Sequence, residues 1–255
     1  MRIGGLTKSS LIDFPGKIAA VLHLQGCNLR CPYCHNPELV LPSCFQEPLD
    51  EEEVLTFLTK RRDQLDGIVV SGGEPTIHRD LPQLLEKIKG LGYQTKLDTN
   101  GTDPEMLRRL LSDDLLDYVA MDVKAPLQNY ATACGRHIPT DKLRTSIWLI
   151  KSSGVEHEFR TTVVPGLHTI RELRSIADSV HGAKKYVVQD FVSDNPLSPA
   201  LRGRPTFAPK PLRDLRRYAE RRVERYEIRT NGDAAQMPTG RHAIPQAEEL
   251  EACSF

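Results

Sequence analysis

The stretch Gly26-Cys27-Asn28-Leu29-Arg30-Cys31-Pro32-Tyr33-Cys34-His35 places three cysteines in the spacing C-x3-C-x2-C. It comes just after an apolar run at residues 17–24 (KIAAVLHL), which predicts a buried β-strand. Thiolates this close in sequence can bind a [4Fe–4S] cluster, which normally has four cysteine ligands. A cluster held by only three would leave one iron open to a small molecule, whereas a fully ligated cluster mainly relays electrons.

Two other interpretations of these cysteines stay open. The pair Cys31 and Cys34 alone has the C-x-x-C spacing of half a zinc site or of a redox pair. A structural zinc site needs a second pair, but Cys44 stands alone and no His-x3–5-His follows it. The spacing therefore favours an iron–sulfur cluster over zinc or redox chemistry. Cys134 and Cys253 are interpreted as ordinary thiols.

The bulk composition excludes several classes of function. The 255 residues contain 34 Lys and Arg and 34 Asp and Glu, so the formal net charge is zero. This balance gives no support for binding to nucleic acid or to a membrane surface. No apolar run approaches the roughly 20 residues that span a bilayer, and the first residues lack the apolar core of a secretion signal. We expect a cytoplasmic protein whose thiols stay reduced and available to metal.

Six apolar, strand-like runs alternate with amphipathic, helix-like runs. The strands are expected at residues 17–24, 67–71, 93–98, 118–123, 156–164 and 185–191. Helix starts are expected at the caps Asp50, Asp80 and Asp103, and the last helix is expected over 213–225. This alternation predicts a parallel sheet with outer helices, and right-handed crossovers curl it into an open barrel. The expected α/β fold is a partial (β/α)6 TIM-like barrel over residues 1–230, followed by a peripheral tail at 231–255.

Unusual polar or glycine-rich clusters stand where four of these strands end. The cysteine loop follows the first strand, and Ser71-Gly72-Gly73-Glu74 closes the second. Asp98-Thr99-Asn100-Gly101 closes the third, and Asp122-Val123-Lys124 closes the fourth. Each cluster alone fits an ordinary turn or strand end. Because active sites of parallel barrels lie at the carboxyl ends of the strands, the shared placement predicts one site.

These motifs together resemble the radical S-adenosylmethionine (SAM) superfamily. The C-x3-C-x2-C loop with an aromatic residue, Tyr33, before its third cysteine is the hallmark, and Gly72-Gly73-Glu74 matches a second motif. The motifs at Asp98 and Asp122 resemble those of activating enzymes of glycyl radical proteins. Residues 7–17 and 34–39 are most similar to anaerobic ribonucleoside-triphosphate reductase activating proteins. The resemblance covers roughly residues 1–190, the span of the β-α units.

The resemblance implies an enzyme that uses one [4Fe–4S] cluster and SAM. Cys27, Cys31 and Cys34 would hold the cluster, and the amino and carboxylate groups of SAM would chelate the fourth iron. Reduction by one electron would cleave SAM to methionine and a 5′-deoxyadenosyl radical, which takes a hydrogen atom from a glycine of a partner protein. The implied partner is anaerobic ribonucleotide reductase, with a flavodoxin or ferredoxin as the electron donor.

The resemblance also implies roles for residues outside the cysteine loop. Backbone carbonyls of Gly72 and Gly73 would accept hydrogen bonds from the SAM ammonium group, and glycine suits such a close approach. Lys124 would meet the SAM carboxylate through a charge-assisted contact. Tyr33 and His35 would flank the adenine. The other members of the implied SAM-binding set are Glu74, Asp98, Thr99, Asn100 and Asp122.

A monovalent cation and a substrate contact are implied in the same way. Asp98, Thr99 and Asp122 match positions that frame a small cation in the pyruvate formate-lyase activating enzyme. Because two carboxylates facing an anionic ligand are unfavourable without such a cation, Na⁺ or K⁺ is expected there. Asp13 and Arg160 match positions that contact the substrate peptide, although a surface ion pair is an equal interpretation.

Three alternatives remain for the function. The client could be another glycyl radical protein, such as pyruvate formate-lyase. The chain could be a radical SAM enzyme for a small molecule, such as a deazapurine synthase. It could also be a non-catalytic zinc or iron–sulfur module, although such a module has no use for a SAM pocket.

Overall fold

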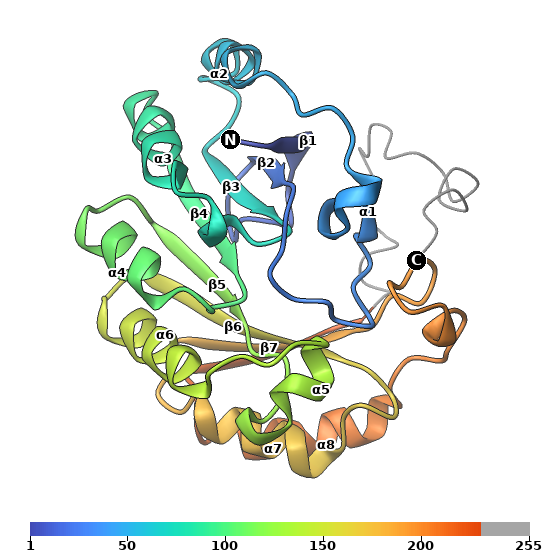
Figure 1. Ribbon diagram of the computed structural model, residues 1–255. Coiled ribbons are helices and arrows are strands. Elements are labelled where there is room, and N and C mark those ends of the chain that lie inside the picture. The colour runs from blue at the N-terminus through green and yellow to red at the C-terminus, as the bar shows by residue number, and fades with distance from the viewer. Residues whose placement is uncertain (231–255) are drawn as a thin grey trace.

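The computed structural model describes residues 1–230, so the tail expected at 231–255 lies outside the described residues. A single curved sheet runs through the molecule in the order β1 to β8 (Figure 1). β1 is antiparallel to β2, and each later strand is parallel to the one before it. The strands are β1 (Ile3–Ser10), β2 (Ala19–Leu24), β3 (Gly67–Gly72), β4 (Gln94–Thr99), β5 (Tyr118–Asp122), β6 (Glu156–Val163), β7 (Lys185–Asp190) and β8 (Arg225–Arg229).

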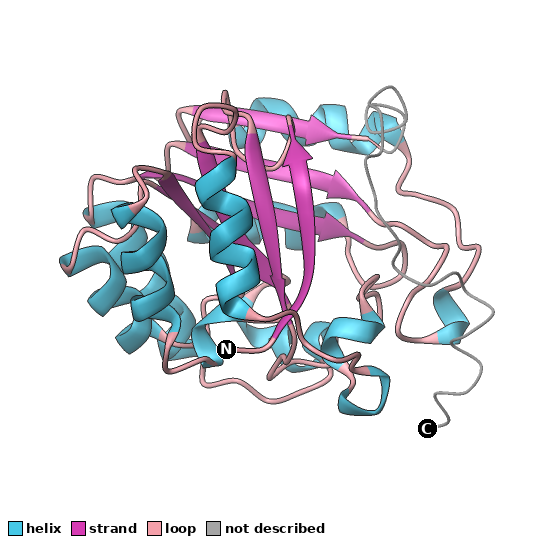
Figure 2. Ribbon diagram, turned by 90° about the horizontal axis from the view of Figure 1, so that it is seen from above, coloured by secondary structure: helices cyan, strands magenta, loops and turns pink. Residues whose placement is uncertain are grey.

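Helices on the outer side of the sheet connect the parallel strands (Figures 1 and 2). The connecting helices are α2 (Glu51–Lys60), α3 (Leu81–Gly90), α4 (Pro104–Ser112), α6 (Thr140–Ser152), α7 (Ile170–Ser179) and α8 (Pro209–Ala219). The loops also contain the short helices α1 (Pro37–Val40) and α5 (Tyr130–Cys134) and the 3-10 turns η1 (Pro42–Cys44), η2 (Pro75–Ile77), η3 (Leu127–Asn129) and η4 (Pro199–Leu201). The units from β2 to α8 confirm the expected partial (β/α)6 barrel.

Two of the three expected helix caps are present. The Asp50 carboxylate accepts hydrogen bonds from the first-turn amides of α2, and Asp103 accepts one from the Met106 amide at the start of α4. α3 begins directly after Asp80 as expected, but the prediction of a side-chain cap is wrong, because Asp80 makes no cap hydrogen bond. Its carboxylate instead lies 2.9 Å from the amino-terminal nitrogen of Met1, a partner that local sequence cannot indicate.

Both edge strands of the sheet escape the sequence pattern. β1 contains two glycines and several polar residues, and its pairing with β2 holds it extended. The helix expected over 213–225 is wrong beyond Ala219, because Arg225–Arg229 forms β8. The charges of Glu227 and Arg229 resemble a solvated helix face, but they pair with side chains of β6 and β7. Pairing with β7 therefore overrides the local preference.

The two faces of the sheet differ in chemistry. Successive side chains of a strand point to opposite faces, and the outward ones join the helices in one large apolar core. On the inner face, a smaller apolar cluster surrounds Phe14, whose ring lies 5.9 Å from that of Tyr118. A Cβ on Gly67 would lie 2.9 Å from the Phe14 ring, so this ring packs directly on the sheet backbone near the start of β3.

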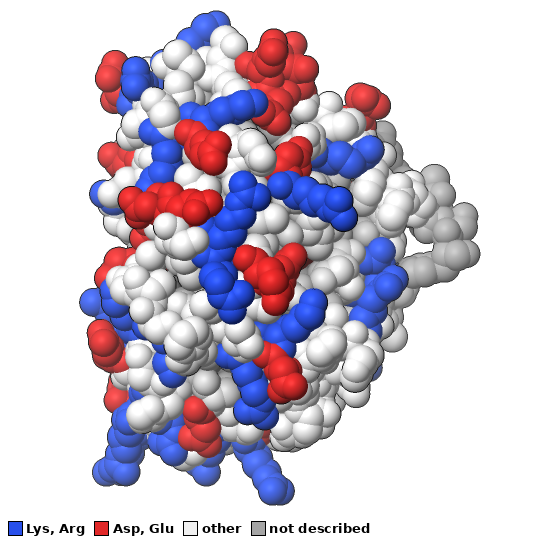
Figure 3. Space-filling model, turned by 60° about the vertical axis from the view of Figure 1, so that its left-hand side comes forward, with Lys and Arg blue, Asp and Glu red and all other residues white. Residues whose placement is uncertain are grey.

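The outer surface carries no block of one charge on the face seen in Figure 3, where acidic and basic side chains are interspersed. This pattern agrees with the formal net charge of zero. Within residues 1–230, no helix is long and apolar enough to cross a membrane.

Candidate functional site

The cysteine loop leaves the carboxyl end of β2 in a series of tight turns. Cys31 is buried, whereas Cys27 and Cys34 are partly exposed. The Arg30 guanidinium donates to the carbonyls of Cys27 and Leu29, at 2.8 and 2.7 Å. The Cys34 amide donates to the Cys31 carbonyl at 3.0 Å, and the Leu29 amide lies 3.4 Å from the Cys27 sulfur. Hydrogen bonds within the loop therefore help to hold its three thiols in place.

The glycine pair after β3 lets a second loop pack against the cysteine loop. The Gly73 amide donates to the Leu24 carbonyl, and the Glu74 amide donates to the Gly26 carbonyl, each at 2.8 Å. A Cβ on Gly72 would lie 2.4 Å from the Leu24 nitrogen, and one on Gly73 would lie 2.0 Å from the Gly26 oxygen. Only glycine permits this approach.

Glu74 connects the loops after β3 and β4. Its carboxylate is 1 % exposed and accepts hydrogen bonds from the Thr99 hydroxyl and the Asn100 amide, both at 2.6 Å. It also accepts from the amide and hydroxyl of Thr76. Burial raises the pKa of Glu74, and these four hydrogen bonds oppose the increase. Both carboxylate oxygens already accept from the protein, so Glu74 acts on the site by positioning it.

Asn100 extends this connection to the cysteine loop. Its side-chain amide donates to the Asn28 side-chain oxygen at 2.9 Å. The Asn28 amide donates in turn to the Thr102 hydroxyl at 2.7 Å. Loops after three different strands thus form one hydrogen-bonded unit, as the expected shared rim requires.

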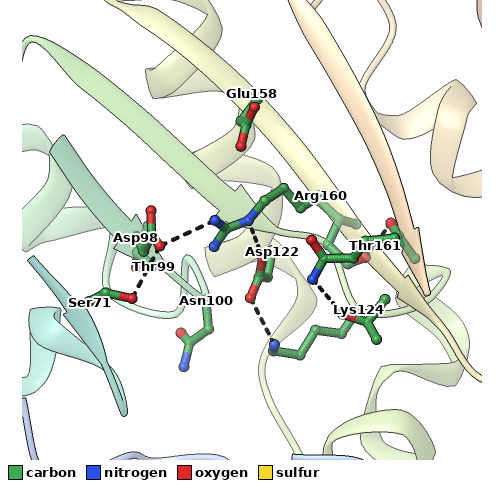
Figure 4. Close-up of polar contacts among 12 residues, drawn as sticks. Ser71, Asp98, Thr99, Asn100, Asp122, Lys124, Glu158, Arg160 and Thr161 are labelled. Carbon is green, nitrogen blue, oxygen red and sulfur yellow. Dashed lines mark hydrogen bonds and ion pairs between the residues drawn. The ribbon is translucent and has the colours of Figure 1, made fainter. Parts of the chain in front are cut away.

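Arg160 on β6 reaches between two carboxylates from neighbouring strands (Figure 4). Its Nε lies 2.9 Å from Asp122 Oδ1, and its Nη1 lies 3.2 Å from Asp98 Oδ2. The other oxygen of each carboxylate pairs with a lysine: Lys96 with Asp98 at 2.5 Å and Lys124 with Asp122 at 3.2 Å. Burial alone would raise the pKa of Asp122, but Arg160 and Lys124 outweigh it and hold that pKa well below its usual range.

This arrangement changes the reasoning for a monovalent cation. Asp98 and Asp122 do lie on one face of the sheet, but a guanidinium already bridges them. The Thr99 hydroxyl is directed to Glu74, where it donates, and it accepts from the Gly101 amide. Since Arg160 supplies the positive charge that two facing carboxylates need, Na⁺ or K⁺ at this place remains a prediction without its original electrostatic support.

Lys124 and Tyr33 lie beside the cysteine thiols. The Lys124 ammonium is close enough to favour the ionised form of all three thiols. Its backbone is held by the Tyr130 hydroxyl, which accepts from the Lys124 amide at 3.2 Å, and by His168 Nε2, 2.8 Å from its carbonyl. The Tyr33 hydroxyl is buried and has no hydrogen-bond partner among the described residues. His35 continues the same loop after Cys34.

These observations fit a cluster with a bound cofactor beside it. Burial raises the pKa of Cys27 to about 12 and that of Cys34 to about 11, so metal binding must displace their protons. A hydrogen bond with Cys134 lowers the pKa of Cys31 to about 7. Within residues 1–230, no three ligand side chains converge on a single ion. A cubic cluster does not require convergence, because each thiolate binds a different iron, and a buried tyrosine hydroxyl without a partner suits a ligand beside it.

Asp13 lies apart from these residues. It follows β1 in the turn that leads to β2, at the opposite end of β2 from the cysteine loop. Its carboxylate accepts from the Ser10 hydroxyl at 2.5 Å. The structure therefore joins Arg160 to Asp98 and Asp122 rather than to Asp13.

Several residues of the site escaped the sequence reasoning. Lys96 has a signal in retrospect, because it stands two residues before Asp98 and shares its face of β4. Ser71 donates to Asp98 at 3.1 Å, and it does come from a motif at a strand end. Asn28, Thr76, Tyr130 and Cys134 carry no signal that singles them out.

Comparisons with known proteins agree with this geometry. The family model described as "Radical SAM superfamily" matches residues 21–180. A Methanocaldococcus jannaschii protein named "Putative glycyl-radical enzyme activating enzyme MJ1227" is 34 % identical over 237 residues, covering 89 % of this chain and 95 % of that protein. The pyruvate formate-lyase-activating enzyme of Clostridium pasteurianum is 31 % identical over 196 residues, covering 72 % and 79 %.

Similarity to solved structures concerns the fold alone. Streptococcus suis SuiB bound to its precursor peptide SuiA superposes with a TM-score of 0.64 at 13 % sequence identity. The match covers 91 % of this chain and 53 % of SuiB, so the chain spans about half the length of that protein.

Proposed function

This chain belongs to the radical SAM superfamily and, within it, to the glycyl-radical enzyme activating enzymes, and we propose that its client is an anaerobic ribonucleoside-triphosphate reductase. Enzymes of this superfamily use a [4Fe–4S] cluster and SAM. The observation that supports SAM cleavage is the meeting of three thiols, a Gly-Gly turn and Lys124 at the carboxyl ends of the parallel strands β2, β3 and β5. The choice of client rests on the resemblance of residues 7–17 and 34–39 to reductase activating proteins, which favours the reductase over pyruvate formate-lyase.

Cys27, Cys31 and Cys34 would hold the cluster as thiolates. When bound, the cluster supplies the electron for reductive cleavage of SAM, which provides the oxidant that removes a hydrogen atom from a glycine of the client. The Lys124 ammonium would bind the SAM carboxylate, and its ion pair with Asp122 and the backbone contacts at Lys124 support that role by holding the lysine in position. The Gly72-Gly73 turn brings backbone beside the cysteine loop, where the SAM ammonium needs acceptors.

Other residues of the rim and the inner face position these groups. Glu74 and Asn100 fix the loops after β3 and β4 against the cysteine loop. Phe14 packs on the inner face near the start of β3, away from the rim, and belongs to the apolar cluster at that end. Arg160, held on the inner face by two carboxylates, would contact a peptide segment of the client.

The iron–sulfur chemistry of the site also indicates the kind of electron donor and the cellular compartment. A flavodoxin or ferredoxin is the expected donor, since the site needs single electrons and the chain has no second cysteine motif. The cytoplasm is the expected compartment, because its reducing conditions keep the three thiols free for iron.

The test of the client uses protein reconstituted with iron and sulfide without oxygen. The protein is reduced with dithionite, given SAM, and assayed for 5′-deoxyadenosine with and without the anaerobic reductase of the same organism. The proposal predicts SAM cleavage and a glycyl radical EPR doublet on the reductase. A doublet on pyruvate formate-lyase and none on the reductase would overturn the choice of client. The Cys31→Ala variant is the matched control and should give neither product nor radical.

A further inference from the structure

A fourth thiol, from Cys134, lies against the cysteine loop. Cys134 is the last residue of α5 and is fully buried. Cys134 and Cys31 are free of disulfides, and their thiols are close enough for each to shift the pKa of the other. Figure 1 shows the loop after β2 running down to α5, a helix that follows β5. Cys31 is therefore the cluster ligand with a second thiol as its neighbour.

Backbone contacts fix this pairing independently of the thiols. The Arg30 amide donates to the Cys134 carbonyl at 2.9 Å. Gly135 follows with a φ of 64°, and a Cβ there would lie 2.2 Å from the Arg30 carbonyl oxygen. The end of α5 thus packs directly on the backbone next to Cys31, an approach that glycine permits. The backbone of Cys134 and Gly135 is therefore held against Arg30, the residue before Cys31.

Iron binding decides which of these two thiols can donate a hydrogen bond to the other. A thiolate that ligates iron carries no proton, so only the Cys134 sulfur can donate. Hydrogen bonds to the sulfurs of an iron–sulfur cluster are among the factors that set its reduction potential. Because reduction adds one negative charge to the cluster and its ligands, a donor to the Cys31 sulfur stabilises the reduced state more than the oxidised one.

We propose that Cys134 is a positioning residue whose S–H donates to the Cys31 sulfur and makes the cluster easier to reduce. The proposal rests on cluster binding by the cysteine loop and is independent of the client. In the one-electron step the electron comes from the reductant, the proton stays on Cys134, and no bond is made or broken at that sulfur. The sequence pattern indicates only an ordinary thiol at Cys134. The proposed role is inferred from the position that the fold gives this residue.

The test compares variants that differ in one donor. Cys134→Val fills the space without a donor, Cys134→Ala leaves space without a donor, and Cys134→Ser keeps a donor. Thr132→Val makes a polar-to-valine change on the exposed side of the same helix and is the matched control. Each is reconstituted without oxygen, analysed for iron and sulfide, and titrated between oxidised and reduced states by EPR. Neither SAM nor a client is needed, so failure of the client assignment would not affect the result.

The donor-free variants should load the cluster and be harder to reduce. At a fixed potential, the ratio of reduced to oxidised cluster should fall about fivefold, since S–H is a weak donor but its acceptor is charged. For one electron this equals a shift of about 40 mV to more negative potential. The serine and Thr132→Val variants should titrate close to the native protein.

Three results would overturn the proposal. One is a valine or alanine variant that titrates at the native potential. Another is a serine variant that shifts as far as the valine variant. The third is loss of iron from both donor-free variants, which would show that Cys134 is a ligand or holds the loop together instead of tuning the cluster.

Discussion

The same strands form both faces of the sheet, but the outer face packs against the helices and the inner face carries the polar site residues. On β5, Val119 and Met121 point outward into the apolar core, whereas Ala120 and Asp122 point inward. Towards the strand ends, the inner face carries the bridge from Asp98 through Arg160 to Asp122. The alternation of a strand thus separates stability from chemistry: the outward residues hold the helices, and the inward residues and following loops form the site.

The largest effect on stability is expected on the outer face. Phe159 on β6 is fully buried in the core between sheet and helices. Phe159→Ala should lower the free energy of unfolding by about 3–5 kcal/mol, because it removes apolar contacts and leaves a cavity. Urea unfolding of the metal-free protein measures this, with Phe159→Leu as a milder control. A decrease in unfolding free energy below about 1 kcal/mol would contradict the claim that the outer face supplies most of the stability.

On the inner face, Arg160→Met should lower stability by removing a charge that two carboxylates share. It leaves Asp98 and Asp122 facing each other without the bridging charge, at an expected cost of about 1–3 kcal/mol, less than for a fully buried pair because the site is partly exposed. Arg160 lowers the pKa of Asp122, so its contribution is present above the unfolded value of 3.8 and is lost as pH falls through the folded pKa. Unfolding of variant and native protein should therefore differ most near pH 7 and converge in acid. An equal difference at all pH values would contradict the ion-pair explanation.

Lys124→Met should separate SAM binding from the fold. The loss of a charge-assisted hydrogen bond to the SAM carboxylate should raise the KM for SAM roughly tenfold to a hundredfold. Iron and sulfide contents should stay native. Lys87→Met, on the exposed side of α3, is the matched control and should leave the KM unchanged. A native KM in Lys124→Met would exclude this lysine from the SAM site.

The smallest expected effect concerns a buried histidine at the start of β6. His157 Nδ1–H donates to the Val155 carbonyl at 2.9 Å, and Nε2 accepts from the Lys184 amide at 3.2 Å. Burial lowers the pKa of His157 below its ordinary 6.5. Below pH 6.5 the unfolded chain therefore binds a proton first, and stability falls by at most about 1.4 kcal/mol per pH unit for this group. His157→Gln should flatten the loss of melting temperature below pH 6.5; an unchanged slope would contradict this assignment.

The sequence predicts the repeating part of the fold well, because periodicity records which side chains are buried. The six β-α units and the rim follow from such patterns. β1 and β8 do not, because their extended form depends on pairing with β2 and β7. The sequence pattern extends α8 too far for the same reason, because the charged side chains of β8 form ion pairs with residues on other strands.

For the site, residue types were predictable and partners were not. The three cysteines, the glycine pair and the acidic strand ends stand out in the sequence, and the structure brings their loops together. Whether Thr99 faces Asp98 or Glu74 depends on loop packing, and so does the placing of Arg160 between two carboxylates. Cys134 shows this limit best, because only the packing of α5 on the cysteine loop distinguishes it from an ordinary buried thiol.

The three-cysteine loop is expected to bind a [4Fe–4S] cluster with one iron open to SAM. This expectation is tested most directly by metal analysis and EPR of the reconstituted protein, reduced with dithionite, with and without SAM. About four iron and four sulfide ions per chain are expected, with an EPR spectrum that changes when SAM binds the open iron. Alanine at Cys27, Cys31 or Cys34 should abolish this signal while the fold persists. Zinc without acid-labile sulfide, or a cluster whose spectrum SAM leaves unchanged, would contradict a SAM-cleaving site at the rim of this barrel.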